Sequence, residues 1–460
     1  MIDSKDILTL LSIPCEVVSD VEIISDTKEI TYVIIELKDN RSSCPFCFQN
    51  NIVIKDYYKV KIKNSIIRKH KLYAEINMRR YKCKNCNKTF KQNFNFYENK
   101  NSISLHTKNI VQNMLMDRIS MEYIAKELNI SKQTVINILD EIPEPQRLTL
   151  PKVICLDEFH FSNANHKAGK YPCVISNPFN TELIDIIESR RKDYLIDYFQ
   201  SISFKERNNV KYFISDMNET YRSIYKIFFK GAVHIVDHFH IVKLFTEAIQ
   251  KIRIKIMKSY PSTSKEYKYL KKNWKLFLMK RFDLKDNKFV NHRNGVTYYT
   301  LDSIDLVLKA FPDLYDVYWA KEEFSSSMLK LHNYDETKNK IDFFINKFSK
   351  SLNKELNNIG ITFKNWYKEI INSYSKNTYG VVLTNAMAES NNNYIQTLIN
   401  IGYGYTNFNR LRKRILYMSS NKNPRLQGAV FLTVFKTGYW QPQSWGFFVR
   451  PIARITLTYP

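Results

Sequence analysis

The sequence predicts a multidomain α+β protein. Its 460 residues are too many for one small core, so we expect two to four domains. Two Cys-x-x-Cys pairs lie in a strand-rich N-terminal part, after which the hydrophobic period changes to that of helices. From residue 152, strand-like and helix-like segments alternate, which is typical of an α/β core.

The charge and apolar content limit the class of partner. Lys and Arg total 70 against 45 Asp and Glu, and a net charge of +25 in a chain with packed domains favours nucleic acid. A bias towards Lys, Asn and Ile codons in an AT-rich genome accounts for part of this excess. No run of about 18 apolar residues occurs, and the N-terminus does not resemble a signal peptide. We therefore expect a cytoplasmic protein without a membrane span.

Four of the seven cysteines form the two Cys-x-x-Cys pairs: Cys44, Cys47, Cys83 and Cys86. Each pair places two thiolates on one side of a tight turn, and two such turns complete a tetrahedral zinc site. The segment between the pairs can contain a hairpin, as in a zinc ribbon. Four unrelated core cysteines are the alternative. Basic residues that include Arg79 and Arg80 favour a ribbon that also contacts DNA.

Residues 118–142 read as two helices around a short turn, the pattern of a helix-turn-helix. The apolar faces are formed by Ile124, Ala125, Leu128, Val135, Ile138 and Leu139. Ser131 can cap the second helix. The N-terminal half of that helix, which touches bases in helix-turn-helix proteins, carries Lys132, Gln133, Thr134 and Asn137. A helical hairpin without a DNA role is the alternative.

Three carboxylates have positions suited to metal-ion chemistry. Asp157 and Asp216 each follow a buried strand, and Glu389 lies near the start of a helix far along the chain. Three such groups can bind two divalent cations, which is what phosphodiester cleavage requires, and Mg²⁺ prefers carboxylate oxygens. Taken singly, each acid has an ordinary explanation as a helix cap or a solvated side chain.

This ordered set of motifs resembles the DDE transposases of the ISL-three insertion-sequence family, over about residues 40–418. The matching segments are the two cysteine pairs, the helix-turn-helix, LDEFHF, SDMNETYRSIY, VDHFHIVK and AESNNNYIQTLINIGYGYTNFNRLRKRIL. The resemblance implies an RNase H-like α/β catalytic core interrupted after its fifth strand by an all-α insertion. It also implies that Asp157, Asp216 and Glu389 bind two Mg²⁺ or Mn²⁺ ions. Asp237 competes with Asp216 for the second acid, and the strand order favours Asp216.

The stretch HIVDHFH, residues 234–240, matches the Asp-x-x-His signature that this family carries after the fifth strand. Its members are Asp237 and His240, which would lie one helical turn apart. We favour a role in positioning a phosphate or ordering the site over direct metal ligation. His234 and His238 have no counterpart in the signature and are interpreted as packing residues.

Two further predictions concern the C-terminal part. Asn392 matches a residue of the family's Asn pair, which either bonds substrate or braces its helix. A basic helix reads as a phosphate-contacting face, with a solvated charged helix as the alternative. Its basic residues are Arg410, Arg412, Lys413 and Arg414.

We expect six segments, the last of which, 423–460, differs in composition and is a read-through scar or an appended element. The others are an N-terminal region with the zinc ribbon (1–100), the helix-turn-helix (101–147), the core (148–245), the insertion (246–375) and the end of the core with Glu389 (376–422).

Together these features predict a transposase that binds the terminal inverted repeats of its element and catalyses metal-dependent DNA cleavage and strand transfer. It would use two Mg²⁺ or Mn²⁺ ions per active site and one structural Zn²⁺. On DNA it would act as a homodimer or larger assembly. A catalytically decayed or domesticated DNA-binding regulator is the alternative, and a nuclease that does not join strands would share the same residues.

Overall fold

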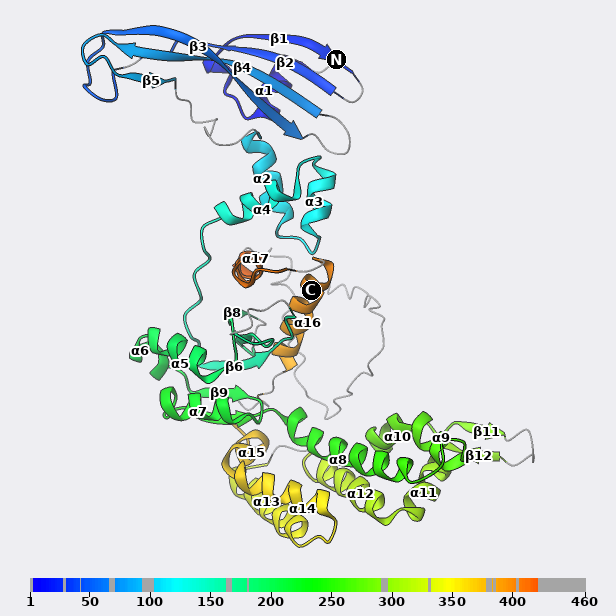
Figure 1. Ribbon diagram of the computed structural model, residues 1–460. Helices are drawn as coiled ribbons and strands as arrows, with labels where there is room; N and C mark the ends of the chain where they lie inside the picture. The colour runs from blue at the N-terminus through cyan, green and yellow to red at the C-terminus, as the bar shows by residue number, and fades with distance from the viewer. Residues whose placement is uncertain are drawn as a thin grey trace, which may run out of the picture. The chain divides into compact units, whose positions relative to one another are not determined.

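The computed structural model describes most of the chain and divides it into two compact units (Figure 1). The larger unit contains the chain up to Ile241 and the segments Lys368–Ser373 and Leu383–Lys422; the smaller contains Val242–Tyr367 and Tyr374–Val382. The described residues are 3–27, 30–41, 43–65, 71–92, 103–162, 168–179, 182–290, 297–329, 332–377, 383, 386–402 and 405–420. The expected tail, 423–460, lies outside them.

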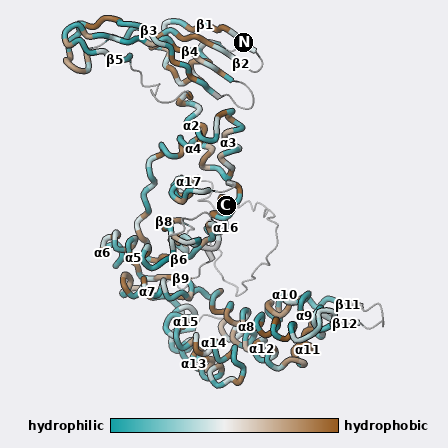
Figure 2. Tube along the Cα trace, in the orientation of Figure 1, coloured by the Kyte–Doolittle hydropathy of each residue, from teal (hydrophilic) through white to brown (hydrophobic). Residues whose placement is uncertain are grey.

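The N-terminal part is a five-stranded sheet of order β1-β2-β4-β3, with β5 paired to β4. Its elements are α1 (Ser4–Leu11), β1 (Val18–Asp26), β2 (Ile30–Leu37), β3 (Ile52–Ser65), β4 (Lys71–Cys83) and β5 (Thr89–Lys91). Buried residues alternate with more exposed ones along β2 and along much of β4, and brown apolar segments mix with teal polar ones along the sheet in Figure 2, so one face of the sheet is largely buried. The buried residues of α1 pack with those of β2 and β4 in one cluster.

Three helices follow: α2 (Leu105–Met114), α3 (Met121–Glu127) and α4 (Lys132–Glu141). Their N-caps are Ser104, Ser120 and Ser131, and each hydroxyl accepts a hydrogen bond from a backbone N–H of the first turn. The turn between α3 and α4 contains Asn129 at a φ of 51°, a conformation that Asn tolerates better than most residues. All six apolar residues predicted to face the interior of this hairpin are buried.

The second sheet has the strand order β10-β9-β6-β7-β8. Its strands are β6 (Val153–Glu158), β7 (Cys173–Ser176), β8 (Leu183–Ile187), β9 (Tyr212–Ser215) and β10 (Val233–Val236). Strands β6, β9 and β10 are parallel, whereas β7 and β8 are antiparallel to their neighbours. Nearly every residue of these strands is buried, as expected for a sheet covered on both faces.

Helices cover both faces of this sheet (Figure 1). The connections between β8, β9 and β10 form α5 (Lys192–Ser201), α6 (Phe204–Asn208) and α7 (Glu219–Phe228). Apolar residues of α5 and α7 pack with Ile154 and Leu156 on one face. On the other face, α16 (Ala386–Ile401) and α17 (Phe408–Ser420) pack with Val174 and Ile186. The end of the chain therefore returns to complete a core begun more than 200 residues earlier.

The smaller unit is mostly helical. Its helices are α8 (His238–Lys258), α9 (Lys265–Lys272), α10 (Trp274–Leu278), α11 (Thr300–Ala310), α12 (Pro312–Ser327), α13 (Tyr334–Ser349), α14 (Lys354–Asn365) and α15 (Tyr367–Tyr374), of which α8 and α15 are shared with the larger unit. Phe245, Phe324, Phe348 and Phe363 pack ring against ring in its core. The expectation of an all-α segment needs one correction, because β11 (Lys288–Val290) and β12 (Thr297–Tyr299) form a short antiparallel pair. None of the described helices is both long and apolar enough to cross a membrane.

Candidate functional site

Two predicted acids lie side by side at the C-terminal ends of two neighbouring strands of the second sheet. Asp157 is near the end of β6, and Asp216 directly follows β9. These strands are parallel, and their register pairs Leu156 with Ser215, so the next residue on each strand reaches the same edge. Asp157, Glu158 and Asp216 each offer one carboxylate oxygen, and all three oxygens lie within 4.8 Å of one another.

Glu158 is a member of this acidic group that the sequence interpretation missed. The adjacent acid in LDEFHF was a visible signal, but neighbouring residues of a strand point to opposite faces. The carboxylate of Glu158 faces α7, where the Tyr221 hydroxyl donates to it over 2.7 Å. Arg190 forms an ion pair with its other oxygen. Burial raises the pKa of the Tyr221 hydroxyl well above its usual value, so this group remains a proton donor.

The polar atoms around Asp157 and Asp216 fit a divalent cation. Asn392, from α16, donates through Nδ2 to Asp157 Oδ2 over 2.7 Å and leaves its own Oδ1 facing inward. Among the described residues, neither Asn392 Oδ1 nor Asp216 Oδ1 has a hydrogen-bond partner, although both atoms are buried. Buried acceptors without a donor are costly, and carboxylate oxygens are the ligands that Mg²⁺ prefers. A cation at this edge would satisfy them.

The predicted Asp-x-x-His pair lies against Asp216. His240 Nε2 is 3.0 Å from Asp216 Oδ2, and His240 Nδ1 is 3.6 Å from Asp237 Oδ2. Burial alone would lower the pKa of His240, but the two carboxylates raise it to about 10. The backbone N–H of Asp237 donates to the Ser215 carbonyl. Asp237 and His240 are therefore placed to orient one oxygen of Asp216.

Glu389 lies in α16, three residues before Asn392. The position of its side chain falls outside what the structure describes. The helix itself packs against β6 and β7.

The four predicted zinc ligands lie together at one end of the N-terminal sheet. The Sγ atoms of Cys44 and Cys86 are 3.7 Å apart, and those of Cys47 and Cys83 are 3.6 Å apart. A tetrahedral site with Zn–S bonds of about 2.3 Å separates its sulfurs by about 3.8 Å. The Cys86 backbone N–H lowers the pKa of the Cys83 thiol to about 7, whereas, against the effect of the Gln49 N–H, burial and the neighbouring thiols raise the pKa of the Cys47 thiol to about 12. The donor set fits one zinc ion.

The two cysteine turns have the same backbone form. In each, the fourth residue after the first cysteine has a positive φ: 58° at Phe48 and 57° at Asn87. The N–H of Cys44 donates to the Gln49 carbonyl, and that of Cys83 to the Lys88 carbonyl. Strands β3 and β4 form an antiparallel hairpin between the turns, as a zinc ribbon requires.

The residues predicted to read DNA lie on the accessible part of α4. Lys132, Gln133 and Asn137 are exposed, and Thr134 is half-buried. Gln133 Nε2 donates to Asn137 Oδ1 over 2.7 Å, so these two amides share one side of the helix. The nearest carboxylate that pairs with Lys132 belongs to Glu122, at 3.9 Å.

Arg79 and Arg80 are half-buried in β4 and already have partners. Arg79 donates to the Leu37 carbonyl over 2.7 Å, and Arg80 lies 3.2 Å from Asp56. Their guanidinium groups lie over the rings of Tyr57 and Tyr58 respectively.

The basic helix α17 requires a correction. Arg414 is fully buried, and its guanidinium donates to three carbonyls and to the Tyr405 hydroxyl. It is therefore a structural group and not a phosphate contact. Arg410 pairs with Asp140, Arg412 pairs with Asp185 and Glu144, and Lys413 donates to the Asp140 carbonyl.

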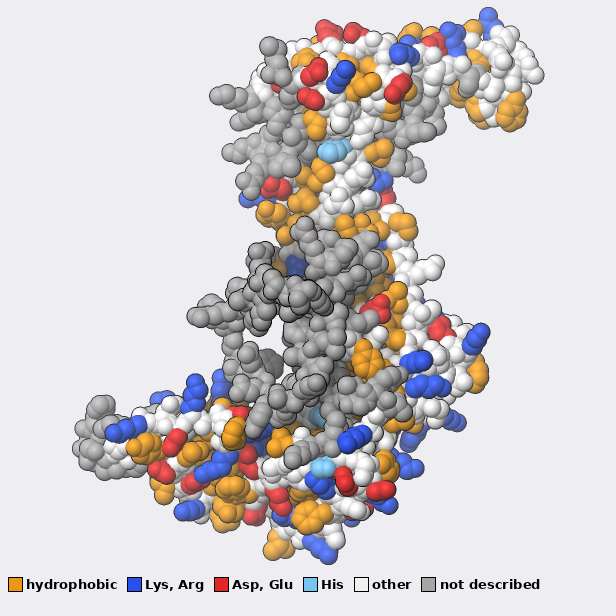
Figure 3. Space-filling model, turned by 180° about the vertical axis from the view of Figure 1, so that it is seen from behind, with side chains coloured by type: hydrophobic (Ala, Val, Ile, Leu, Met, Phe, Trp, Pro, Cys, Tyr) orange, Lys and Arg blue, Asp and Glu red, His pale blue; other side chains and the backbone are white. Residues whose placement is uncertain are grey.

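Within this helix, Arg410, Arg412 and Lys413 contact α4, the segment after it and β8. On the face seen in Figure 3, the described Lys and Arg side chains lie among acidic ones and do not gather into a single patch. On that face, the charge of the described side chains does not by itself locate a DNA-binding surface.

Comparison with known proteins identifies the family. The sequence model of one family, described as a transposase, matches residues 154–415, which is more than half of the chain. No curated protein matches the chain. The matched region contains Asp157, Asp216, Glu389 and the Asp237–His240 pair. The chain belongs to the ISL-three family of DDE transposases.

Proposed function

We propose that this transposase binds the terminal inverted repeats of its insertion sequence and catalyses metal-dependent DNA cleavage followed by strand transfer. The observation that carries the proposal is the pairing of Asp157 and Asp216 at the C-terminal ends of adjacent parallel strands, with a buried oxygen on Asp216 that has no hydrogen-bond partner among the described residues. The strand order β10-β9-β6-β7-β8 supports an RNase H-like core. The helices between β10 and α16 support an insertion domain within it.

In this proposal Asp157, Asp216 and Glu389 hold two Mg²⁺ or Mn²⁺ ions. When bound, the metal activates the attacking water or 3′-hydroxyl and stabilises the leaving oxygen. The protein's own part is to position the acids. Asn392 orients Asp157 through one hydrogen bond, and His240, supported by Asp237, orients Asp216.

DNA recognition is assigned to two elements of the larger unit. Helix α4 would place Lys132, Gln133, Thr134 and Asn137 in a major groove. The zinc ribbon, with one structural Zn²⁺, would contact the backbone beside it through the segment that carries Arg79 and Arg80. Because two element ends must meet, we propose a homodimer or larger assembly on DNA, acting in a bacterial cytoplasm.

Replacement of Asp216 by Asn should lower metal-dependent cleavage at the element boundary by at least about 100-fold, because a ligand of the metal that stabilises charge in the transition state is lost. The measurement is cleavage of a duplex carrying the element end, with Mg²⁺ or Mn²⁺. Asp193→Asn is the matched control, since Asp193 is an exposed acid at the start of α5. Equal cleavage by Asp216→Asn and the unaltered protein would refute the assignment.

Two other outcomes would identify the alternatives. Specific binding without cleavage by the unaltered protein would indicate a decayed transposase that acts as a regulator. Boundary cuts without joined products would indicate a nuclease.

Replacement of Lys132 by Ala should weaken binding to all DNA sequences and reduce the slope of log K against log salt by about 1, because one phosphate contact is lost. Gln133→Ala should instead reduce the preference for the element end. The measurement is fluorescence anisotropy over a salt series. Lys5→Ala, an equal charge change on α1, is the control. An unchanged slope in Lys132→Ala would remove this residue from the interface.

A further inference from the structure

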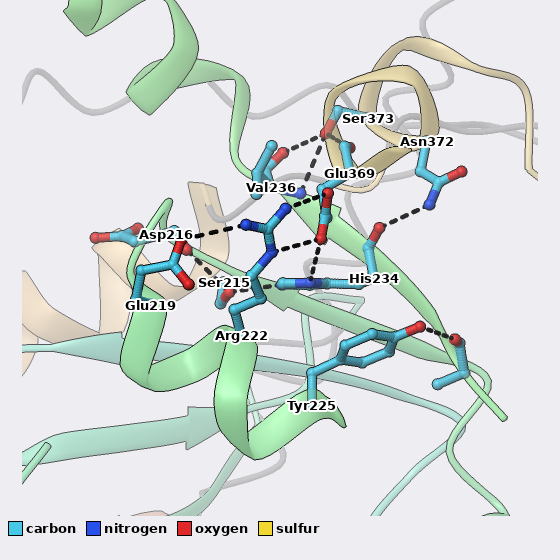
Figure 4. Close-up of polar contacts among 11 residues, drawn as sticks. Ser215, Asp216, Glu219, Arg222, Tyr225, His234, Val236, Glu369, Asn372 and Ser373 are labelled. Carbon is cyan, nitrogen blue, oxygen red and sulfur yellow. Dashed lines mark hydrogen bonds and ion pairs between the residues drawn. The ribbon is translucent and has the colours of Figure 1, made fainter. Parts of the chain in front are cut away.

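A buried polar network lies behind the acidic site, outside the residues assigned to metal or DNA. It is formed by α7, β9, β10 and α15 (Figure 4). Helix α15 contains the segment Lys368–Ser373, with which the chain re-enters the larger unit. Its central carboxylate belongs to Glu369, a residue that is buried as a whole.

Helix α15 contacts β10, which is an edge strand of the sheet. The Ser373 hydroxyl accepts from the Val236 N–H over 3.1 Å and lies 2.6 Å from the Val236 carbonyl, to which it can donate. Asn372 Nδ2 donates to the His234 carbonyl over 2.9 Å. Because edge strands otherwise leave backbone groups without partners, these side chains fasten α15 to the strand that precedes Asp237.

Glu369 forms a forked ion pair with Arg222 of α7. Arg222 Nε donates to Oε1 over 2.9 Å, and Nη2 donates to Oε2 over 3.0 Å. Both side chains are nearly buried, at 13% and 10% exposure. Helix α7 begins at Glu219, three residues after Asp216. The ion pair therefore joins α15 to the helix that begins three residues after Asp216.

Glu369 also lies near His234, whose imidazole contacts the residue before Asp216. His234 Nδ1 lies 3.7 Å from Glu369 Oε1, and His234 Nε2 lies 3.0 Å from the Ser215 hydroxyl. The Ser215 hydroxyl carries one proton and also lies 3.0 Å from the Asp216 carbonyl, so it can donate either to that carbonyl or to His234 Nε2. Ser215 is the residue immediately before Asp216. His234 is thus a connecting residue and not only a packing one.

The charges of this network are consistent with that geometry. Burial alone would raise the pKa of Glu369, but His234 and Arg222 lower it to about 2. Burial lowers the pKa of His234. An ionised Glu369 beside a neutral imidazole and a guanidinium is a satisfied arrangement in a buried place.

We infer that Glu369 is a positioning residue for Asp216, because its carboxylate binds the helix after Asp216 through Arg222 and lies beside the imidazole of His234, which contacts the residue before Asp216. The inference rests on the proposed role of Asp216 as a metal ligand. A buried ion pair contributes little net stability compared with apolar residues of the same size, so a network of this kind is better explained by the geometry that it imposes. Partners that orient metal ligands typically change metal affinity about 10–100-fold when removed.

The test is a titration of the zinc-loaded, full-length protein with Mn²⁺. Electron paramagnetic resonance measures the concentration of free Mn²⁺ at each point. The relevant Mn²⁺ site is the one that Asp216→Asn abolishes. Glu369→Gln should raise the Kd of that site by about tenfold or more. The Mn²⁺ concentration for half-maximal cleavage should rise equally, while DNA affinity stays the same. Glu206→Gln is the matched control, because Glu206 forms a similar forked pair with Arg147 elsewhere in the unit. It should leave Mn²⁺ binding unchanged.

Two further variants separate positioning from simple charge compensation. His234→Phe keeps an aromatic ring but cannot bond Ser215, and it should weaken Mn²⁺ binding even if Glu369→Gln fails to fold. The double variant Arg222→Met with Glu369→Gln removes the unpaired charge. If Glu369 only neutralises Arg222, this double variant will bind Mn²⁺ as the unaltered protein does, and the inference is wrong.

The possible failures are distinguishable. If Asp216→Asn binds Mn²⁺ as tightly as the unaltered protein, the proposed metal role of Asp216 fails, and this inference fails with it. If Asp216→Asn loses Mn²⁺ while Glu369→Gln and His234→Phe retain full affinity, only the positioning role of Glu369 is refuted.

Discussion

Replacement of Cys83 by Ser is expected to abolish zinc binding and to unfold the end of the N-terminal sheet that carries the four cysteines. Cys83 is buried at the end of β4, where the apolar cluster is small and consists mainly of Cys44, Ile52 and Tyr81. So few apolar contacts cannot offset the entropy of ordering two turns. In zinc-finger peptides the metal contributes an apparent binding free energy of about 10–16 kcal/mol, and we expect most of the local stability here to come from it.

The effect should be confined to that end of the sheet. A separate and larger apolar cluster joins α1 with β2 and β4 around Val33, Ile35 and Ile76. Hydrogen exchange followed by mass spectrometry should therefore show lost protection near the cysteine turns and retained protection in α1 and β2. Zinc content, measured on the same samples, should fall from one ion per chain to none.

Cys15→Ser is the matched control for this experiment, since Cys15 is an exposed cysteine outside the group of four. It should keep its zinc and its exchange pattern. A Cys83→Ser protein that retains one zinc ion, or that loses zinc without any change in exchange, would contradict the structural role assigned to the metal.

Replacement of Arg414 by Met is expected to destabilise the larger unit by about 3–5 kcal/mol, because several buried acceptors would lose a charged donor together. The guanidinium donates to the carbonyls of Leu115, Asp117 and Ile119 and to the Tyr405 hydroxyl. Those carbonyls lie between α2 and α3, whereas Arg414 belongs to α17. One side chain therefore joins the segment between α2 and α3 to helix α17.

The measurement is the free energy of unfolding from urea titration, followed by hydrogen exchange of α2 and α3. Arg410→Met is the control, because the Arg410–Asp140 pair is partly exposed and such pairs are worth up to about 1 kcal/mol. If Arg414 were instead a phosphate contact, Arg414→Met would leave stability unchanged and reduce the salt dependence of DNA binding. That result would reverse the correction made for this residue.

Local features of the chain were readable without any tertiary information. Ser131 and the apolar residues of the α3–α4 hairpin act within a few positions of one another, and the structure has them as expected. The paired cysteines were equally clear, since each Cys-x-x-Cys turn is a local structure and only the meeting of the two turns requires β3 and β4. Short-range spacing and capping chemistry are sufficient for elements of this kind.

The basic helix α17 shows where the same reasoning fails. Its sequence has the composition of a DNA-contacting face, but Arg414 is buried and its neighbours pair with acids from α4, β8 and the segment after α4. Those acids lie more than 200 residues away along the chain. Charge composition predicts that a basic residue needs a partner, but it does not reveal whether the partner is a phosphate or another part of the protein.

By itself, the sequence determined the cysteine turns, the helical hairpin, the strand-ending acids and, through their order, the family. The tertiary structure alone decided that Asp157 and Asp216 lie at the ends of neighbouring strands and that the Glu158 carboxylate is near them. It also decided that Glu369 lies beside His234 and Arg222. The physical reason is that local structure depends on residues a few positions apart, whereas these contacts depend on strand register and on helices that return from distant parts of the chain.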